Sequence, residues 1–159
     1  MRSPNVQIEH LADHKGALPE IVRWVHTEWG HLMPNISYGK LVSNFKERLT
    51  PHSIPETFVA TINNKIVGTA SIVAHDLSTR MDLSPWMAAV YVIPGYRNLG
   101  IGSTIVRAIM EEASILRLER IYLITPDQEY FYTNLGWQTL EKTYYRGEVV
   151  TIMMYEVSE

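Results

Sequence analysis

A glycine-rich segment near the middle of the chain has the residue types that bind phosphate. Arg97 opens the segment, and Gly100 and Gly102 follow it. An apolar, β-branched run at 88–93 precedes the segment, and a helical pattern of apolar residues at 105–116 follows it. A strand, a glycine turn and a helix N-terminus in this order bring unpaired backbone N–H groups and the positive end of a helix dipole to one point. Because glycine has no Cβ, an anion can approach this backbone closely, so the segment predicts a phosphate site.

Three kinds of phosphate loop could account for this segment. A nucleotide-hydrolysing P-loop has a Lys after its last glycine, whereas Gly102 is followed directly by Ser103 and Thr104. A dinucleotide-binding loop needs a third small residue where this chain has Ile105, and an acidic residue on a later strand, which Asp127 matches only in part. The third pattern is Arg-x-x-Gly-x-Gly after a strand that ends in Val-x-Pro. The chain matches this third pattern at every constrained position.

The third pattern resembles the pyrophosphate loop of the GNAT N-acetyltransferases. A second segment, YFYTNLGW at 130–137, resembles the Phe-Tyr-x-x-x-Gly-Phe segment of the same family, with Trp137 in place of the last Phe. Short stretches at 27–29, 83–86 and 125–128 resemble bacterial members related to the N-terminal acetyltransferases that act on processed actin.

The patterning of the rest of the chain predicts the elements that must position these two segments. We expect helices at 17–30 and 38–49, after the phosphate loop, and from Asp127 as N-cap to Gly136. Strands are expected at 6–11, 57–62, 65–74, 88–93, 120–125, 137–145 and 149–157. This order resembles the GNAT arrangement. It implies an α+β fold with a central mixed, mostly antiparallel sheet of about seven strands and four helices, in a single N-acetyltransferase domain over 1–159.

Composition excludes several classes of protein. The chain has 159 residues, no cysteine and a net charge of −3, so disulfides, thiol nucleophiles and zinc–thiolate sites are excluded, and a nucleic-acid partner is not expected. We see no signal peptide and no apolar run long enough to span a membrane. We therefore expect a cytoplasmic enzyme with no membrane partner, which could form a homodimer.

The resemblance implies that acetyl-CoA is the co-substrate and that no metal is needed. Its acetyl group would pass by direct attack to a primary amine, either a peptide or protein N-terminus or a small amine. The strand at 90–92 would splay away from 120–125 and pair with the pantetheine, although a normally paired parallel sheet is the alternative. The expected cofactor-binding residues are Tyr91, Val92, Arg97, Asn98, Leu99, Gly100, Ile101, Gly102 and Ser103.

One catalytic residue follows from the resemblance, and the general base does not. Tyr132 matches the family tyrosine that gives a proton to the departing thiolate, although it could instead only pack with Phe131 and Leu135. Backbone N–H near Val92 could polarise the carbonyl. Many relatives carry a Glu near the start of the strand that corresponds to 86–92, and this chain has no acid there. The candidates for the base are Glu28, His31, His75, Asp76, Asp82 or an ordered water.

The missing strand carboxylate also supports a second hypothesis, in which the chain is a catalytically silent acyl-CoA-binding sensor or interaction module on the same fold. The intact phosphate loop and Tyr132 argue against it. The acceptor would lie between the stretches at 29–34 and 144–147, which combine aromatic residues with one arginine. These stretches do not identify the amine.

Overall fold

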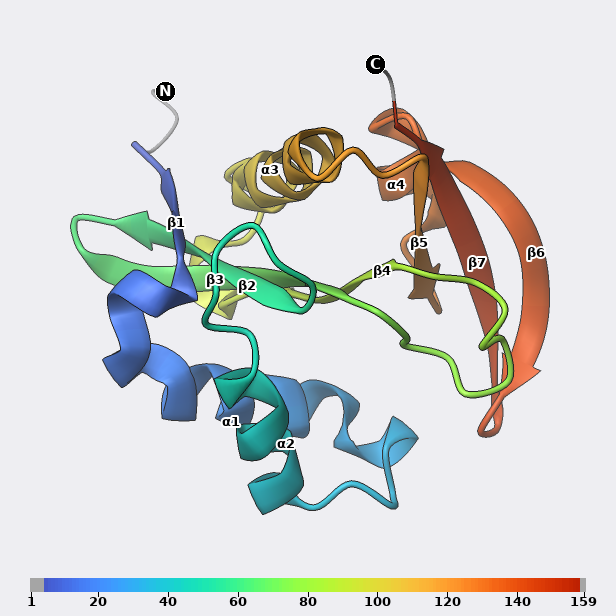
Figure 1. Ribbon diagram of the computed structural model, residues 1–159, viewed down its shortest axis with the longest axis horizontal. Coiled ribbons are helices and arrows are strands. Elements are labelled where there is room, and N and C mark those ends of the chain that lie inside the picture. The colour runs from blue at the N-terminus through green and yellow to red at the C-terminus, as the bar shows by residue number, and fades with distance from the viewer. Residues whose placement is uncertain (1–4, 158–159) are drawn as a thin grey trace.

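A seven-stranded sheet forms the centre of the computed structural model, which describes residues 5–157 (Figure 1). The strands lie in the order β1-β2-β3-β4-β5-β7-β6. Their bounds are β1 (Gln7–His10), β2 (Glu56–Ile62), β3 (Lys65–Val73), β4 (Trp86–Val92), β5 (Arg120–Thr125), β6 (Gln138–Tyr145) and β7 (Glu148–Glu156). All neighbouring strands are antiparallel except β4 and β5, which are parallel. The prediction of a mixed, mostly antiparallel sheet is confirmed.

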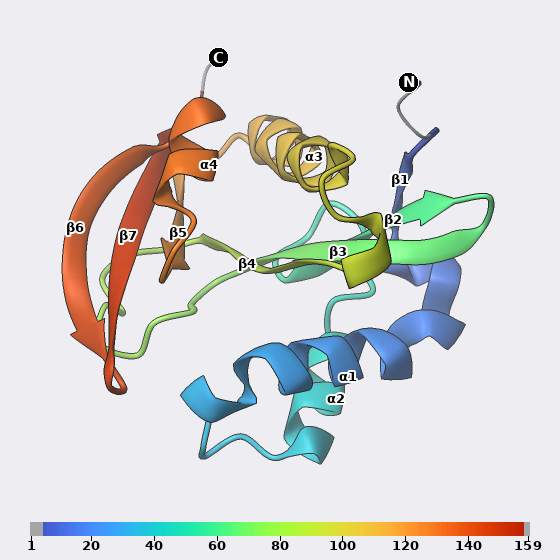
Figure 2. The same ribbon diagram turned by 180° about the vertical axis from the view of Figure 1, so that it is seen from behind.

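Helices cover both faces of the sheet (Figures 1 and 2). On one face lie α1 (Leu18–Trp29) and α2 (Tyr38–Lys46), and on the other lies α3 (Ile101–Ile115), while α4 (Glu129–Asn134) packs beside β6. The four predicted helices are confirmed. The structure adds three short turns of 3₁₀-helix, η1 (Leu11–Ala17), η2 (Gly30–Leu32) and η3 (Pro94–Tyr96). Among the described residues, no helix combines the length and the apolar character that crossing a bilayer requires.

The helical spacing that predicted α1 and α3 corresponds to their buried faces. Ile105, Ile109 and Ala113 of α3 are fully buried against the sheet, and so are Ile21 and Val22 of α1 on the opposite face. Each helix buries an apolar stripe of the kind that a 3.6-residue period produces, which holds the two layers on the sheet.

Two predicted helix ends are wrong. The helix expected to run to Leu49 ends at Lys46, because the chain turns toward Pro51. Asp127 is not the N-cap of α4: that position is Gln128, which makes no side-chain cap. Instead, the Thr125 hydroxyl accepts hydrogen bonds from the N–H groups of both Gln128 and Asp127, at 2.9 and 3.4 Å.

The strands β4 and β5 separate almost as soon as they meet. Their pairing consists of one register pair, Trp86 opposite Tyr122. Beyond it, β4 stays paired with β3, and β5 stays paired with β7. A register shift in the β3–β4 pairing coincides with Ala89, whose φ is +55°. This bulge bends β4 away from its parallel neighbour, so the predicted splay is confirmed.

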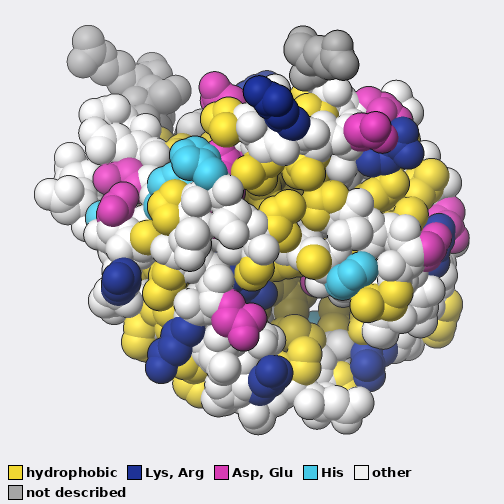
Figure 3. Space-filling view, viewed as in Figure 1, with side chains coloured by type: hydrophobic (Ala, Val, Ile, Leu, Met, Phe, Trp, Pro, Cys, Tyr) yellow, Lys and Arg dark blue, Asp and Glu magenta, His cyan; other side chains and the backbone are white. Residues whose placement is uncertain are grey.

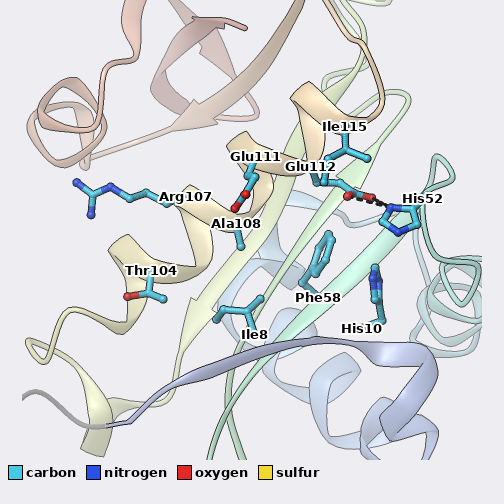
Figure 4. A pocket seen from close by; sticks show the side chains of 10 residues that line it. All are labelled: Ile8, His10, His52, Phe58, Thr104, Arg107, Ala108, Glu111, Glu112 and Ile115. Carbon is cyan, nitrogen blue, oxygen red and sulfur yellow. Dashed lines mark hydrogen bonds and ion pairs between the residues drawn. The ribbon is translucent and has the colours of Figure 1, made fainter. Parts of the chain in front are cut away.

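A group of acids and histidines lies between β1, β2 and α3, on the side of the sheet away from α1 and α2 (Figure 4). Glu56 and Glu112 are only 1% and 3% exposed. His52 Nδ1 lies 2.9 Å from Glu112 Oε2, and the backbone N–H of His52 donates to Glu56 Oε2 at 3.0 Å. Burial, and then the neighbouring Glu112, raise the pKa of Glu56 to about 8. Glu56 therefore holds its proton more tightly than a free glutamate does, and the group ties the 47–55 loop to α3.

The raised pKa of Glu56 makes folding stability depend on pH. The folded protein binds this proton more tightly than the unfolded chain does, so the free energy of unfolding should fall as pH rises from about 4.5 to about 8. Glu56→Gln keeps a hydrogen-bond donor and removes the titration. Melting curves from pH 5 to 8.5 should show the parent losing at least about 3 °C relative to Glu56→Gln, equivalent to about 1 kcal/mol. Parallel curves would contradict the assignment.

Candidate functional site

A cleft of about 1260 Å³ occupies the gap that opens between β4 and β5. Its walls come from α2, the segments that follow α1 and β3, the strand β4 with the loop after it, the start of α4, and the β6–β7 hairpin. Figure 3 shows the molecule hollowed in this region, with hydrophobic side chains on much of the wall. The separation of the two strands therefore creates this cleft between them.

Most of the predicted cofactor residues line this cleft. They are Tyr91, Val92, Arg97, Asn98, Gly100, Gly102 and Ser103. The other two do not line it: the Ile101 side chain is 1% exposed in the core under α3, and the Leu99 side chain is 39% exposed at the surface. These two positions can offer only their backbone to a ligand in the cleft.

The glycine loop presents backbone donors at the N-terminus of α3. Gly100 is the N-cap with φ of +82°, a conformation that glycine adopts without strain. The Thr104 N–H donates to the Gly100 carbonyl at 3.1 Å. Before that bond, the N–H groups of 101–103 have no carbonyl partner within residues 5–157. Three donors at the start of a 15-residue helix make a strong site for an anion.

Arg97 joins this loop to the end of β4. Its Nε donates to the Val92 carbonyl at 2.8 Å, and its guanidinium lies 5.2 Å from the centre of the Tyr91 ring. Tyr91 in turn contacts Trp24 and Trp29 of α1. Arg97 therefore holds the loop and adds positive charge beside the free N–H groups.

The backbone of β4 offers a further donor to the cleft. The Ile93 N–H donates to the Val67 carbonyl of β3 at 3.0 Å. In an antiparallel pair, successive residues direct their N–H groups to opposite sides of the strand. The Val92 N–H is thus directed away from β3, into the gap where a paired parallel strand would otherwise lie.

Tyr132 lies in the cleft wall and also packs in the core. It is 8% exposed, and its ring contacts the rings of Phe131 and Trp137 at 5.0 and 6.1 Å between centres. Burial, and then the charge of Asp127, raise the pKa of Tyr132 above its usual value. The hydroxyl therefore stays protonated at neutral pH. Tyr132 therefore packs in the core and also lines the cleft, where a proton donor to the thiolate would have to lie.

Four of the five candidate bases line the cleft: Glu28, His31, His75 and Asp76. Asp82 does not. It forms an ion pair with Arg80, at 3.0 Å from Arg80 Nε, and this hydrogen bonding lowers the pKa of Asp82. His31 lies 3.6 Å from Glu148, which links the segment after α1 to the β6–β7 hairpin.

Arg48 is a cleft residue that the sequence did not single out. It follows α2, where a basic residue at a helix end is typical of a solvated surface. Its guanidinium instead lies 4.1 Å from the centre of the Phe45 ring and donates to Ser71 Oγ at 3.2 Å. Burial lowers the pKa of Arg48 to about 10.

Asp76 lies in the same region of the cleft as Arg48. Asp76 is an exposed residue of the cleft wall, and desolvation by the neighbouring protein raises its pKa to about 6, against the opposing effect of Arg48. Asp76 is therefore the candidate base whose pKa lies closest to neutrality among those with a resolved shift.

Comparison with protein families gives one match, over residues 53–139, to the model described as the acetyltransferase (GNAT) domain. The match covers more than half of the chain. A search of curated proteins gives no match.

Solved structures with the same fold include three acetyltransferases. A GNAT-family acetyltransferase from Streptococcus pneumoniae is 15% identical with a TM-score of 0.68, covering 97% of this chain and 100% of that one. An aminoglycoside 6'-N-acetyltransferase complexed with coenzyme A is 13% identical with a TM-score of 0.74, covering 96% and 98%. A GNAT-family acetyltransferase from Elizabethkingia anophelis with acetyl-CoA bound is 15% identical with a TM-score of 0.55, covering 74% and 82%. At these identities the likeness establishes the fold.

A side chain at Gly102 should block anion binding at the loop. A Cβ there would lie 3.6 Å from Phe131, which is ordinary contact, and Gly102 has no positive φ. Gly102→Val should therefore fold while its methyl groups crowd the helix N-terminus. We expect its Kd for coenzyme A, measured by calorimetry, to rise at least about tenfold, or ~1.4 kcal/mol.

Gly16→Val is the matched control, since a Cβ at Gly16 meets nothing within 4 Å and Gly16 does not line the cleft. Coenzyme A binding by Gly102→Val at the parental affinity would show that the loop is not the phosphate site. Gly100 is less suitable for this test, because its φ of +82° strains any side chain.

Proposed function

Because this chain belongs to the GNAT acetyltransferase family, we propose that it transfers an acetyl group from acetyl-CoA to a primary amine, carried by a peptide or protein N-terminus or by a small molecule. The observation that carries the proposal is one continuous cleft. It joins the free N–H groups of 101–103, the unpaired edge of β4 and Tyr132.

The cleft offers one site for phosphate and one for amide groups, and coenzyme A carries both kinds of group. The N–H groups of 101–103, with Arg97, would take the pyrophosphate, and the open edge of β4 would pair with the pantetheine amides. Acetyl-CoA supplies an acetyl group that is activated as a thioester. The pantetheine amides would therefore supply the hydrogen-bond partners that the backbone groups on the free edge of β4 lack.

The chain's own residues would serve the transfer as follows. The neutral amine attacks the thioester carbonyl carbon, a C–N bond forms, the C–S bond breaks, and the amine loses one proton while the sulfur gains one. The Val92 N–H would donate to the carbonyl oxygen as negative charge develops there. Tyr132 would donate its hydroxyl proton to the sulfur.

The raised pKa of Tyr132 bears on that last step. Ordinary values of about 10 for tyrosine and about 8.5 for a thiol make the proton transfer unfavourable by roughly 2 kcal/mol. Burial raises the pKa of Tyr132 and so makes it harder for the hydroxyl to give up its proton. Desolvation in the same cleft also raises the pKa of the thiol, so the thiolate takes a proton more readily and the two effects offset each other.

Asp76 is our candidate for the base. It lines the cleft, and its pKa of about 6 leaves it ionised and able to accept a proton at pH 7. It would take the proton of the incoming amine directly or through water. It would replace the strand carboxylate that many relatives have and this chain lacks.

The acceptor side would lie between η2 and the β6–β7 hairpin. His31 and Met33 line the cleft from one side, and Tyr145 and Arg146 from the other. The aminoglycoside acetyltransferase with the same fold supports a small amine, and the resemblance to actin-type enzymes supports a peptide N-terminus.

Release of free thiol from acetyl-CoA, assayed over a panel of amines and peptides, tests the proposal. Binding of acetyl-CoA without release on any acceptor would support the sensor hypothesis instead.

Removal of the Tyr132 hydroxyl should slow the chemical step. Tyr132→Phe keeps the ring contacts with Phe131 and Trp137, so stability and acetyl-CoA affinity should change little. If the hydroxyl protonates the sulfur, the single-turnover rate should fall about 10²-fold. A chemical step within about threefold of the parent would remove Tyr132 from the mechanism and leave water as the proton source.

Removal of the Asp76 carboxylate should change the pH profile. In the parent, kcat/KM should rise as pH passes about 6, because the base must be ionised. Asp76→Asn should lose this step and fall about 10²-fold at pH 7, while any rise due to the amine's own titration persists. An unchanged step near pH 6 in Asp76→Asn would assign it to another group. Asp82→Asn, which alters an acid outside the cleft, is the control.

A further inference from the structure

We propose that Arg48 binds a carboxylate of the acceptor, so that the preferred acceptors carry both a primary amine and a carboxylate group. The inference rests on the proposed acetyl transfer for its setting and names the substrate class of that site. Three observations support the inference. The Arg48 side chain is held in one place, no carboxylate contacts its guanidinium, and its partner Ser71 pairs with β4 at a point away from the phosphate loop.

The sheet holds Arg48 in a defined position. Its guanidinium lies on the Phe45 ring and donates to Ser71 Oγ at 3.2 Å. Ser71 Oγ is in turn 2.7 Å from Thr57 Oγ1, and both residues are buried. The Arg48 carbonyl also accepts from the Thr57 N–H at 3.3 Å. The side chain and the main chain of Arg48 are thus both attached to the β2–β3 pair, which leaves the guanidinium little freedom.

The guanidinium has no carboxylate partner. Within residues 5–157, no acidic oxygen lies within 4 Å of it, and its one hydrogen-bond partner is a hydroxyl. None of its nitrogens is sealed from solvent without a partner, so its remaining donors face the cleft that Arg48 lines. Arg48 is only partly exposed, so protein replaces part of the water around its charge. A carboxylate in the cleft would compensate for this loss, through the two parallel hydrogen bonds that guanidinium geometry favours.

The position of Arg48 distinguishes this anion from the phosphates of the co-substrate. Ser71, its partner, pairs with Ala88 at the bulge of β4, whereas the phosphate loop follows the far end of that strand after Val92. The other two arginines that line the cleft also each donate to one neutral oxygen, Arg97 to the Val92 carbonyl and Arg146 to the Tyr145 hydroxyl, and Arg97 belongs to the phosphate loop. Arg48 therefore lies away from the phosphate loop, in the part of the cleft next to the β4 bulge, and the acceptor carboxylate would lie there.

The charge beside Arg48 matches the rest of such an acceptor. Asp76 lies in the same part of the cleft, and Arg48 acts on it electrostatically without forming an ion pair with it. One cation and one anion that line the cleft, and that form no ion pair with each other, complement a molecule that carries a carboxylate and an amine. With the carboxylate at Arg48, the amine would lie toward Asp76, which is our candidate base.

Matched pairs of acceptors test this inference. Each pair consists of an α-amino acid and its carboxamide, which keeps the amine and the side chain but removes the negative charge. Methionine, phenylalanine and glutamate give three pairs of different side chain. Binding is measured by calorimetry in the presence of coenzyme A, and turnover is measured separately by release of thiol from acetyl-CoA. The parent should bind the acid of at least one pair at least tenfold more tightly than its carboxamide.

Arg48→Gln should remove that preference. Its Kd and KM for the acid should rise at least tenfold, while those for the carboxamide change less than twofold, and Arg48→Lys should restore part of the preference. Lys46→Gln is the control, because Lys46 is exposed on α2 and does not line the cleft. Equal losses for both members of a pair would overturn the inference and assign Arg48 a structural or carbonyl-polarising role.

Failure of the inference and failure of the proposed function give different results. If the parent releases thiol with amines but treats acids and carboxamides alike, the inference is wrong and acetyl transfer stands. If the acids bind with the Arg48-dependent preference but no acceptor releases thiol, the carboxylate site stands and the proposed transferase function fails.

Discussion

The point at which β4 and β5 separate controls where the site can form. Trp86 and Tyr122 make their one register pair, their rings lie 5.6 Å apart, and the Tyr122 N–H donates to the Pro85 carbonyl at 3.1 Å. Trp86 is fully buried, with its indole N–H bonded to the Leu83 carbonyl at 2.8 Å. This buried contact holds the two strands together at one end, and the bulge at Ala89 takes β4 away from β5. The remaining backbone groups on that edge of β4 then need a partner from water or from a ligand.

The segment after α2 connects the two faces of the sheet. Arg48 at its start lines the cleft and is bonded to the buried Ser71 of β3, and His52 near its middle is bonded to Glu112 of α3 on the opposite face. The same segment therefore positions a cation for the acceptor and attaches to the helix whose N-terminus presents the anion site. Buried polar groups on both faces are retained at a cost in desolvation, which the pKa values of Arg48 and Glu56 reflect.

Local patterns predicted the parts of this fold that depend on neighbours in sequence. The loop before α3 follows from its glycines, and the β2–β3 turn at Asn63-Asn64 takes the positive φ angles that its residue types favour. The splay of β4 was different: the strand residues alone left a normal parallel pairing open, and the family resemblance together with the adjacent anion loop favoured separation. Thr125, not Asp127, accepts hydrogen bonds at the start of α4, and it does so from the N–H groups of Asp127 and Gln128, so the turn is held one step before the predicted cap.

Contacts between distant residues could not be predicted from the sequence. Arg48 looks like a solvated residue at a helix end until Ser71 and Phe45 are placed around it. Glu56 and Glu112 are far apart in the chain, and nothing in their local sequence indicates that they share one buried space. The predicted cofactor residues were easier, because the cleft residues from Tyr91 to Ser103 are continuous in sequence and fold as one strand, turn and helix start.

Backbone amide hydrogen exchange with and without acetyl-CoA tests the central claim most directly, since that claim concerns N–H groups that lack partners in the free protein. The account predicts that the N–H groups of Val92 and of 101–103 exchange quickly in the free protein and become protected when acetyl-CoA is added. The N–H of Ile93, which is already bonded to β3, should change little. Protection of Val92 and 101–103 before addition, or no gain of protection at saturating acetyl-CoA, would contradict the account.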